Sequence, residues 1–173
     1  LQQAVGFPVN DSVDIWGAAG LRPQDAGWNK PFSPLFKYQW EPTYEALRRH
    51  AGAHADNPFD GALMHYTNPA SGGHVTATMG ASMQLLRPGF AGKAHRHTGS
   101  FLYQVSKGRG YSIINGQRFD WQERDIFCVP SWAWHEHANA SASEDACLFC
   151  FNDLPVMNSL GLYREEALGD NGG

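Results

Sequence analysis

Four histidines in two short runs have the residue type and spacing that suit metal chemistry. A single arginine separates His95 from His97, and a single glutamate separates His135 from His137. Both runs read as strands, in which side chains alternate between the two faces, so each pair points to one side of its strand. Neutral imidazoles converging from two strands form a typical transition-metal site, whereas isolated pairs are more often core or surface histidines. The spacing predicts a metal centre at His95, His97 and His135.

Three histidine ligands leave coordination positions open, and the ion decides what chemistry they allow. Fe(II), Mn(II) and Co(II) favour six ligands, so a chelating substrate and O2 could bind together. Zn(II) would leave one tetrahedral position and could activate water. The run from Thr98 to Leu102 after the first pair contains no carboxylate. A bound ion would therefore keep both positive charges and attract a dianionic chelating substrate.

Two further polar residues are candidates for contact with a substrate. His137 shares a strand face with His135 but lies one step further along, so it is either a catalytic proton acceptor or a hydrogen-bonded structural histidine. Gln84 is either an amide that points inward to the substrate or a solvated side chain. His50 and His54 stand four residues apart on a predicted helix, but we interpret them as a solvated helix end.

The chain that must position these residues changes character near residue 60. From there on, short strand-like runs alternate with turn signals, which predicts an all-β antiparallel sandwich or barrel. Asn115-Gly116 is a strong two-residue hairpin signal. The predicted strands cover residues 63–66, 76–86, 101–105, 111–114, 126–129 and 146–152.

The segments on either side of this barrel have weaker patterns. Residues 1–59 are expected to form an N-terminal extension or linker, mostly loop over 1–35, with a short strand at 36–40 and a helix near 42–51.

Residues 60–168 are expected to hold the barrel and a C-terminal helical tail. Two short helical pieces are predicted between Pro155 and Leu168, with a break at Gly161. Residues 169–173 are expected to be a disordered tail.

Composition excludes several classes of protein. A hydrophobic content of 42% and a charged content of 17% suit one globular domain. A net charge of −4 without a basic run argues against nucleic acid as a partner, and no apolar run reaches the ~18 residues of a membrane span. Three cysteines fit a reducing, cytoplasmic setting. Cys147 and Cys150 should lie on opposite strand faces, and we expect them and Cys128 to be packing residues.

The two histidine runs resemble the two motifs of the cupin superfamily. The first motif, G-x5-H-x-H with a closing glycine, is matched at Gly89, His95, His97 and Gly108. The second motif, P-x-G-x2-H-x3-N, is matched at Pro130, His135 and Asn139. Trp132 and Arg124 stand where glycines are usual, and Phe101 or Leu102 replaces the motif glutamate.

These departures, with several longer runs, are similar to gentisate 1,2-dioxygenases and to relatives that cleave salicylate or 1-hydroxy-2-naphthoate. The resemblance covers residues 36–167, and the runs that carry it are 68–73, 84–89, 95–100, 125–137 and 160–166.

The resemblance implies a double-stranded β-helix, or jelly-roll, that holds Fe(II) between His95, His97 and His135. It also implies a substrate chelated through its carboxylate and adjacent hydroxyl, with O2 beside it and ring opening between the two substituted carbons. Gentisate would give maleylpyruvate. By position, His137 and Gln84 match residues of the substrate pocket, whereas the arginines that clamp the substrate carboxylate in this family have no secure counterpart.

The leading hypothesis is therefore an extradiol-type ring-cleaving dioxygenase of aromatic catabolism. Members of the family usually have two barrels and form dimers or tetramers, and this chain resembles the C-terminal half. A non-catalytic cupin module and a Zn-dependent hydrolase or isomerase are the alternatives from other classes.

Overall fold

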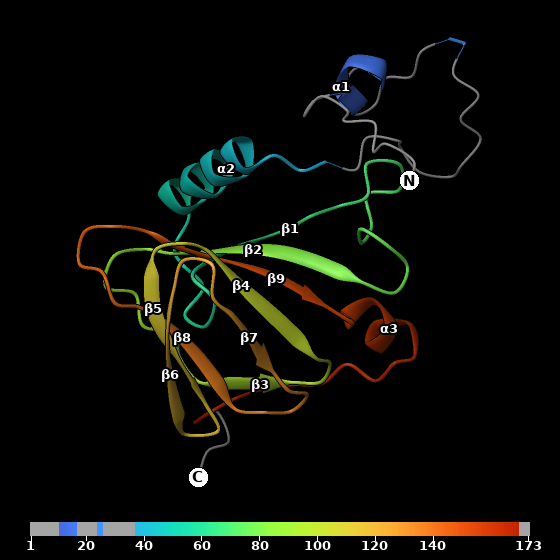
Figure 1. Ribbon diagram of the computed structural model, residues 1–173. Helices are drawn as coiled ribbons and strands as arrows, with labels where there is room; N and C mark the ends of the chain where they lie inside the picture. Colours follow the sequence, from blue (N-terminus) through green and yellow to red (C-terminus); the bar gives the residue numbers. More distant parts are fainter. Residues whose placement is uncertain (1–10, 17–23, 26–36, 170–173) are drawn as a thin grey trace, which may run out of the picture.

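Two five-stranded antiparallel sheets form the body of the protein (Figure 1). The computed structural model describes residues 11–16, 24–25 and 37–169. Strands follow the order β1-β2-β9-β4-β7 in one sheet and β10-β3-β8-β5-β6 in the other, which confirms the predicted all-β jelly-roll. The helices are α1 (Asp11–Trp16), α2 (Trp40–Ala53) and α3 (Leu154–Ser159). The strands are β1 (Ala62–His65), β2 (Gly80–Leu86), β3 (His95–His97), β4 (Phe101–Lys107), β5 (Arg109–Ile114), β6 (Gln117–Gln122), β7 (Ile126–Val129), β8 (His135–Asn139), β9 (Ala146–Asn152) and β10 (Glu165–Ala167).

The main core joins side chains from both sheets. Tyr103 and Val105 alternate along β4 with partly exposed neighbours, so they share one face and pack with Leu148 of β9 and Trp121 of β6. Burying each large apolar side chain contributes about 1.5–3 kcal/mol relative to leaving it exposed.

Helix α2 covers the other face of the first sheet and includes the predicted helix at 42–51. Leu47 and Ala51 lie one turn apart and pack against Met83 and Leu85 of β2. None of the helices in the described part of the chain has the length and apolar character that a membrane crossing needs.

The cysteines are divided between these two layers. Cys147 packs in the cluster under α2 and Cys150 in the core between the sheets, which confirms their placement on opposite faces of β9. Cys128 is exposed, so the expectation that it is a packing residue is wrong.

The Asn115-Gly116 turn joins β5 to β6 as predicted. Both residues have positive φ, 49° and 80°, as the two central residues of a type I′ turn require. This backbone twist matches the right-handed twist of the flanking strands, so the turn sets their register.

Three predictions for the flanking segments need correction. Trp40 begins α2 and stacks on Tyr44, and residues 37–39 are not a strand, so the predicted strand at 36–40 is wrong; Phe36 lies outside the described residues. Helix α1 and a turn at 24–25 are the described parts of the segment 1–35, so the prediction of loop there is wrong over α1. The rest of this segment lies outside the described residues.

The third correction concerns the tail. Helix α3 forms as expected, but the second predicted helical piece is strand β10, which pairs with β3. The pairing places Ala167 opposite His95 and Glu165 opposite His97. Residues 170–173 lie outside the described residues.

Gly110 should tolerate no side chain. A Cβ at this position would overlap the carbonyl oxygen of Ala138 and the ring of Trp121. We expect Gly110→Ala to lower the free energy of unfolding by about 3 kcal/mol through overpacking. In contrast, Gly52→Ala on α2 meets no atom within 4 Å and should stabilise by up to about 1 kcal/mol. Urea unfolding would measure both, and equal effects of the two substitutions would contradict the expected overlap at Gly110.

Candidate metal centre

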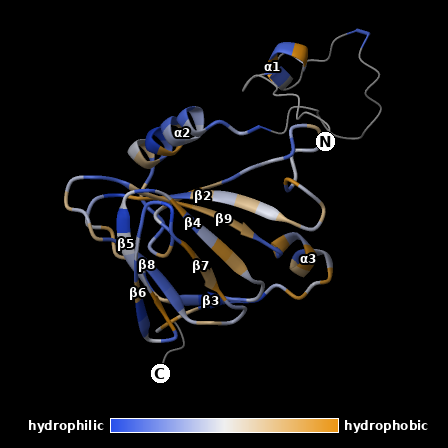
Figure 2. Cartoon of the chain, viewed as in Figure 1, coloured by the Kyte–Doolittle hydropathy of each residue, from blue (hydrophilic) through white to orange (hydrophobic). Residues whose placement is uncertain are grey.

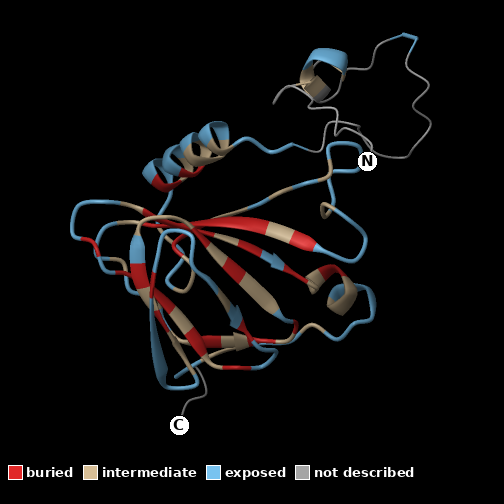
Figure 3. Cartoon of the chain, viewed as in Figure 1, coloured by how far each residue is buried: buried red, intermediate tan, exposed pale blue. Residues whose placement is uncertain are grey.

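Strand β8 is hydrophilic along its length, yet most of it is buried (Figures 2 and 3). His135, His137 and Asn139 are each at most 5% exposed. Buried polar groups are normally hydrogen-bonded, and Asn139 meets this rule because its amide donates to three backbone carbonyls. The two histidines are not fully satisfied in this way, so β8 is the place to look for a ligand.

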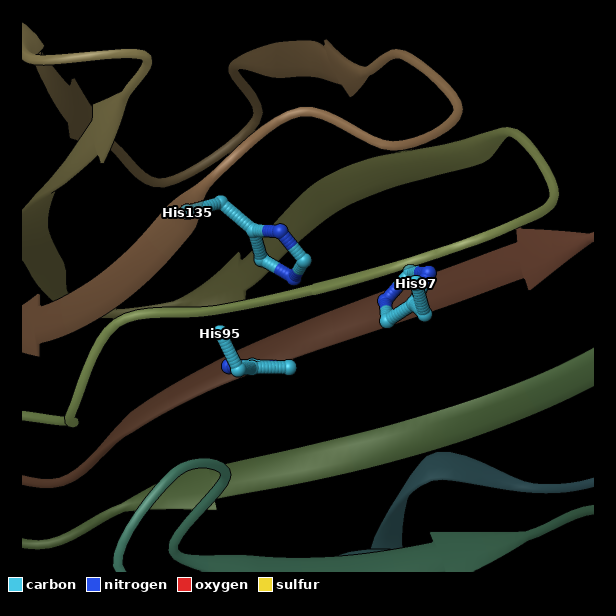
Figure 4. Close-up of side chains that lie close together, drawn as sticks. All are labelled: His95, His97 and His135. Carbon is cyan, nitrogen blue, oxygen red and sulfur yellow. The ribbon is translucent and has the colours of Figure 1, made fainter. Parts of the chain in front are cut away.

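His95, His97 and His135 converge on one point, as their spacing predicts. One nitrogen of each ring lies within 4.8 Å of the corresponding nitrogen of the other two, and all three residues are buried. Figure 4 shows the three side chains turned toward a common space, His95 and His97 from β3 and His135 from β8. The strands meet where His95 pairs with His135, which places their ring centroids 4.2 Å apart.

The donor set fits a transition metal. The Nδ1 of His135 lies 2.9 Å from the carbonyl oxygen of Ala133, and because a carbonyl only accepts, Nδ1 carries the proton. The Nε2 of His135 is then an unprotonated nitrogen, buried without a hydrogen-bond partner. A bound ion would satisfy this lone pair.

No carboxylate joins this cluster in the described part of the chain. Phe101, at a position where the cupin motif has glutamate, places its ring centroid 4.1 Å from that of His97. The site therefore offers three neutral nitrogens, and a divalent ion bound there would keep its full charge.

Burial keeps His97 and His135 neutral. It lowers the pKa of His97 to about 4 and that of His135 to about 3, and the neighbouring imidazoles contribute in the same direction. Metal binding requires the neutral imidazole, so both residues are ready to bind an ion at pH 7 without losing a proton.

The strand that supplies two ligands is only three residues long and is held on both edges. Strand β10 pairs along one edge of β3, and β8 pairs along the other only at His95. On the β8 side, the backbone N–H of Trp132, in the loop before β8, donates to the carbonyl oxygen of His97 at 2.8 Å. This loop therefore holds His97 in place.

Arg96 fastens β3 from the face opposite the ligands. Its guanidinium donates twice to Glu166 Oε2, at 2.8 and 2.5 Å, and lies 4.5 and 4.4 Å from the ring centroids of Trp132 and Trp134. The charged pair and the two cation–π contacts join β3 to β10 and to the loop that leads into β8. We name the four residues Arg96, Trp132, Trp134 and Glu166 the Arg96 clip.

Both residues that replace motif glycines keep a left-handed backbone. Trp132 has φ 65° and Arg124 has φ 80°, a region that costs roughly 1–2 kcal/mol for a residue other than glycine. Contacts offset this strain: Trp132 bonds His97 and stacks on Arg96, and the Arg124 N–H donates to the Val105 carbonyl at 2.8 Å.

His137 lies deeper than the three-histidine cluster. It is fully buried, its Nδ1 lies 2.8 Å from Ser112 Oγ, and that oxygen also accepts from Trp121 Nε1 at 2.9 Å. Its Nε2 has no hydrogen-bond partner. The hydrogen bond to Ser112 fits a structural histidine, and the unpartnered Nε2 fits a proton acceptor. The catalytic role of His137 therefore stays a prediction.

Gln84 points into the protein rather than to solvent. It is 1% exposed and donates from Nε2 to Asp60 Oδ1 at 3.2 Å, whereas its Oε1 has no partner. The solvated alternative is therefore wrong, and contact with a substrate stays a prediction. The rings of His50 and His54 are adjacent at the end of α2, and their interpretation as a solvated helix end stays a prediction.

A cavity of about 220 Å³ adjoins His95 and His97. Several of its polar lining residues were not predicted from the sequence, because strands far apart in the chain bring them together. They are Asp60, His65, Ser82, Tyr103, Asn152, Tyr163 and Glu165. Strand alternation could have suggested His65 and Ser82, which face each other across β1 and β2. The described lining includes no arginine or lysine, so it does not supply the clamping arginines for which the sequence offers no secure counterpart.

Known proteins resemble this chain in sequence and in fold. Residues 82–152 match the Cupin domain family. A 5-aminosalicylate 1,2-dioxygenase of Comamonas sp is 44% identical over 78% of this chain and 36% of its own length. Gentisate 1,2 dioxygenase 1 of Aquipseudomonas alcaligenes is 34% identical over 95% of this chain and 46% of its own length.

The solved structures agree. A salicylate 1,2-dioxygenase from Pseudaminobacter salicylatoxidans superposes with a TM-score of 0.75 at 31% identity, over 92% of this chain and 46% of that one. The chain thus spans between about a third and a half of the length of these relatives.

The Arg96 clip should support metal affinity. We expect Arg96→Ala to raise the Kd for Co(II) about tenfold, because β3 loses its outer fastening, and Arg96→Lys to restore part of it. Arg118→Ala is the matched control. Like Arg96, Arg118 pairs with a carboxylate, that of Asp120, and lies over an aromatic ring, that of Tyr111. Titration followed by the Co(II) absorption spectrum measures the Kd, and equal values for both alanine variants would refute the role of the clip.

The metal-free protein should lose stability in acid. The pKa values of His97 and His135 are lower in the folded state than the ordinary value of 6.5, so the unfolded chain binds more protons below that value. Stability is complete above pH 6.5 and falls as the pH drops toward 4, by about 1.4 kcal/mol per histidine at pH 5.5.

Urea unfolding of chelator-treated protein at several pH values would test this dependence. His135→Asn should flatten the slope, whereas substitution of the exposed His54 by Gln should leave it unchanged. An unchanged slope in the His135 variant would contradict the assignment.

Proposed function

Because the chain belongs to the cupin superfamily and is similar to part of the gentisate and salicylate 1,2-dioxygenases, we propose that it is an Fe(II)-dependent, extradiol-type ring-cleaving dioxygenase. Its proposed substrate is gentisate or a related single-ring 2-hydroxybenzoate, and gentisate with O2 would give maleylpyruvate. The observation that carries the proposal is the buried cluster of three histidines with no carboxylate among them. A salicylate or 1-hydroxy-2-naphthoate 1,2-dioxygenase is the alternative within the same class.

Three histidine nitrogens suit Fe(II) better than they suit an ion that requires anionic ligands. Fe(II) bound by His95, His97 and His135 would supply open positions for the substrate's carboxylate and hydroxyl and for O2. The three rings would hold the ion, and the Ala133 carbonyl orients His135 through its Nδ1 proton. Phe101 and Tyr103 line the adjoining cavity and exclude water beside the reacting ring.

We assign the substrate's hydroxyl proton to His137. Ser112 Oγ can accept from both Trp121 Nε1 and His137 Nδ1, and this tautomer leaves His137 Nε2 free to take a proton. The side chain of Gln84 would hold the substrate through its unpartnered Oε1.

The size of the cavity favours a single aromatic ring. At about 220 Å³ it is smaller than pockets for drug-sized ligands, which are typically ~300–1,000 Å³. A fused two-ring acid such as 1-hydroxy-2-naphthoate fits this space less well than gentisate or salicylate.

A metal-binding cupin module without turnover is the second candidate. The observation that favours it is that the chain spans only 36% to 46% of the compared relatives, so residues from another barrel or another copy could be required for turnover. We also propose a homo-oligomer, a dimer or a tetramer, because the resemblance to this family implies such assembly.

Anaerobic reconstitution with Fe(II) tests the proposal. We expect O2 uptake with gentisate and the absorbance of a ring-opened product, and a loss of at least about 100-fold in His135→Ala because one of three ligands is gone. His54→Ala, on the surface, is the control. Iron binding without O2 uptake from gentisate, salicylate or hydroxynaphthoate would favour the binding module instead.

A further inference from the structure

The cavity beside the metal centre carries acidic groups where an aromatic acid would have to bind. Asp60 and Glu165 line it, and no arginine or lysine does so in the described part of the chain. Arg96, the cation nearest in sequence to the ligands, is turned away from them and pairs with Glu166. Among the described residues that line the cavity, no side chain offers the substrate's anionic group a positive charge, so a bound metal ion would have to supply it.

Asp60 is the inner of the two carboxylates. It precedes β1, is partly buried, and accepts a hydrogen bond from Gln84, which is itself only 1% exposed. Glu165 lies at the more exposed rim, opposite His97 in the β3–β10 pairing, and accepts from the Tyr163 hydroxyl at 3.0 Å. The Gln84 bond holds one Asp60 oxygen in place, and the carboxylate retains further lone pairs for a ligand.

We infer that Asp60 makes the site selective for 2-hydroxybenzoates whose ring carries a hydrogen-bond donor, an amine or a second hydroxyl. This inference rests on the proposed function, because it assumes that the carboxylate and the adjacent hydroxyl occupy the metal. The remaining ring substituent would then lie in a cavity whose lining includes the acceptor oxygens of Asp60 and Glu165. A donor is stabilised there, an apolar group gains nothing, and an acceptor such as a nitro group leaves Asp60 facing another electronegative atom.

The substitution Asp60→Asn tests whether the selectivity comes from the hydrogen-bond acceptors of Asp60 or from the shape of the cavity. The new amide is the same size, and its oxygen can still accept from Gln84. Its other end is an NH2 group, which donates. The substitution should therefore remove the preference for donors and improve the binding of a nitro substituent.

The test uses the full chain loaded with Zn(II), so that ligands bind without turnover. Calorimetry would compare 5-aminosalicylate with 5-methylsalicylate, which match in size but differ in the donor, and gentisate with 5-nitrosalicylate. We expect the wild-type chain to bind each donor compound about tenfold more tightly than its partner. Asp60→Asn should bring each ratio near one or reverse it, and Asp120→Asn, a remote surface carboxylate paired with Arg118, should keep the wild-type ratios.

Equal binding of the amino and methyl compounds by the wild-type chain would overturn the inference, as would unchanged ratios in Asp60→Asn. The O2 electrode then tests the proposed function separately with the Fe(II)-loaded chain. O2 uptake without donor selectivity would contradict the role of Asp60 and support the proposed dioxygenase. Donor selectivity in binding without O2 uptake would support the role of Asp60 and reject the dioxygenase.

Discussion

The structure depends on three buried imidazoles packed close to one another inside a β-sandwich. Their burial is unfavourable unless the ring nitrogens find partners, since an unsatisfied buried polar group costs about 1–3 kcal/mol. His135 meets half of this requirement with the Ala133 carbonyl and leaves the other nitrogen for an ion. A bound ion would give that nitrogen a partner, so metal binding and native stability would be linked through the same atoms.

Strand alternation separates coordination from support in β3. His95 and His97 face inward, and Arg96, between them, faces outward to Glu166 and the indole rings. A single three-residue strand thus holds two ligands on one face and their fastening on the other. The strained Trp132 completes this arrangement, because its backbone bonds His97 while its ring covers Arg96.

The features that local spacing controls were predictable from the sequence. The convergence of the three histidines follows from period-two alternation, the Asn115-Gly116 hairpin from its turn residues, and strands β7 and β9 from apolar runs with clear ends. Strand β10 was not predictable, because three residues are too few to show an alternation of side chains and their extended conformation comes from pairing with β3. The lining of the cavity was also hidden, since Asp60, Tyr103 and Glu165 meet only after distant strands have paired.

The pairing of β10 with β3 also determines when the site can form. Arg96 and Glu166 are 70 residues apart, so a ribosome must add most of the barrel after the first ligand pair before its outer partner exists. Until then the nascent chain presents His95 and His97 on a strand with an open edge, a state prone to pairing with other chains. Long-range closure of this kind is slow, and ion capture by the finished sheet would be one of the last events in maturation.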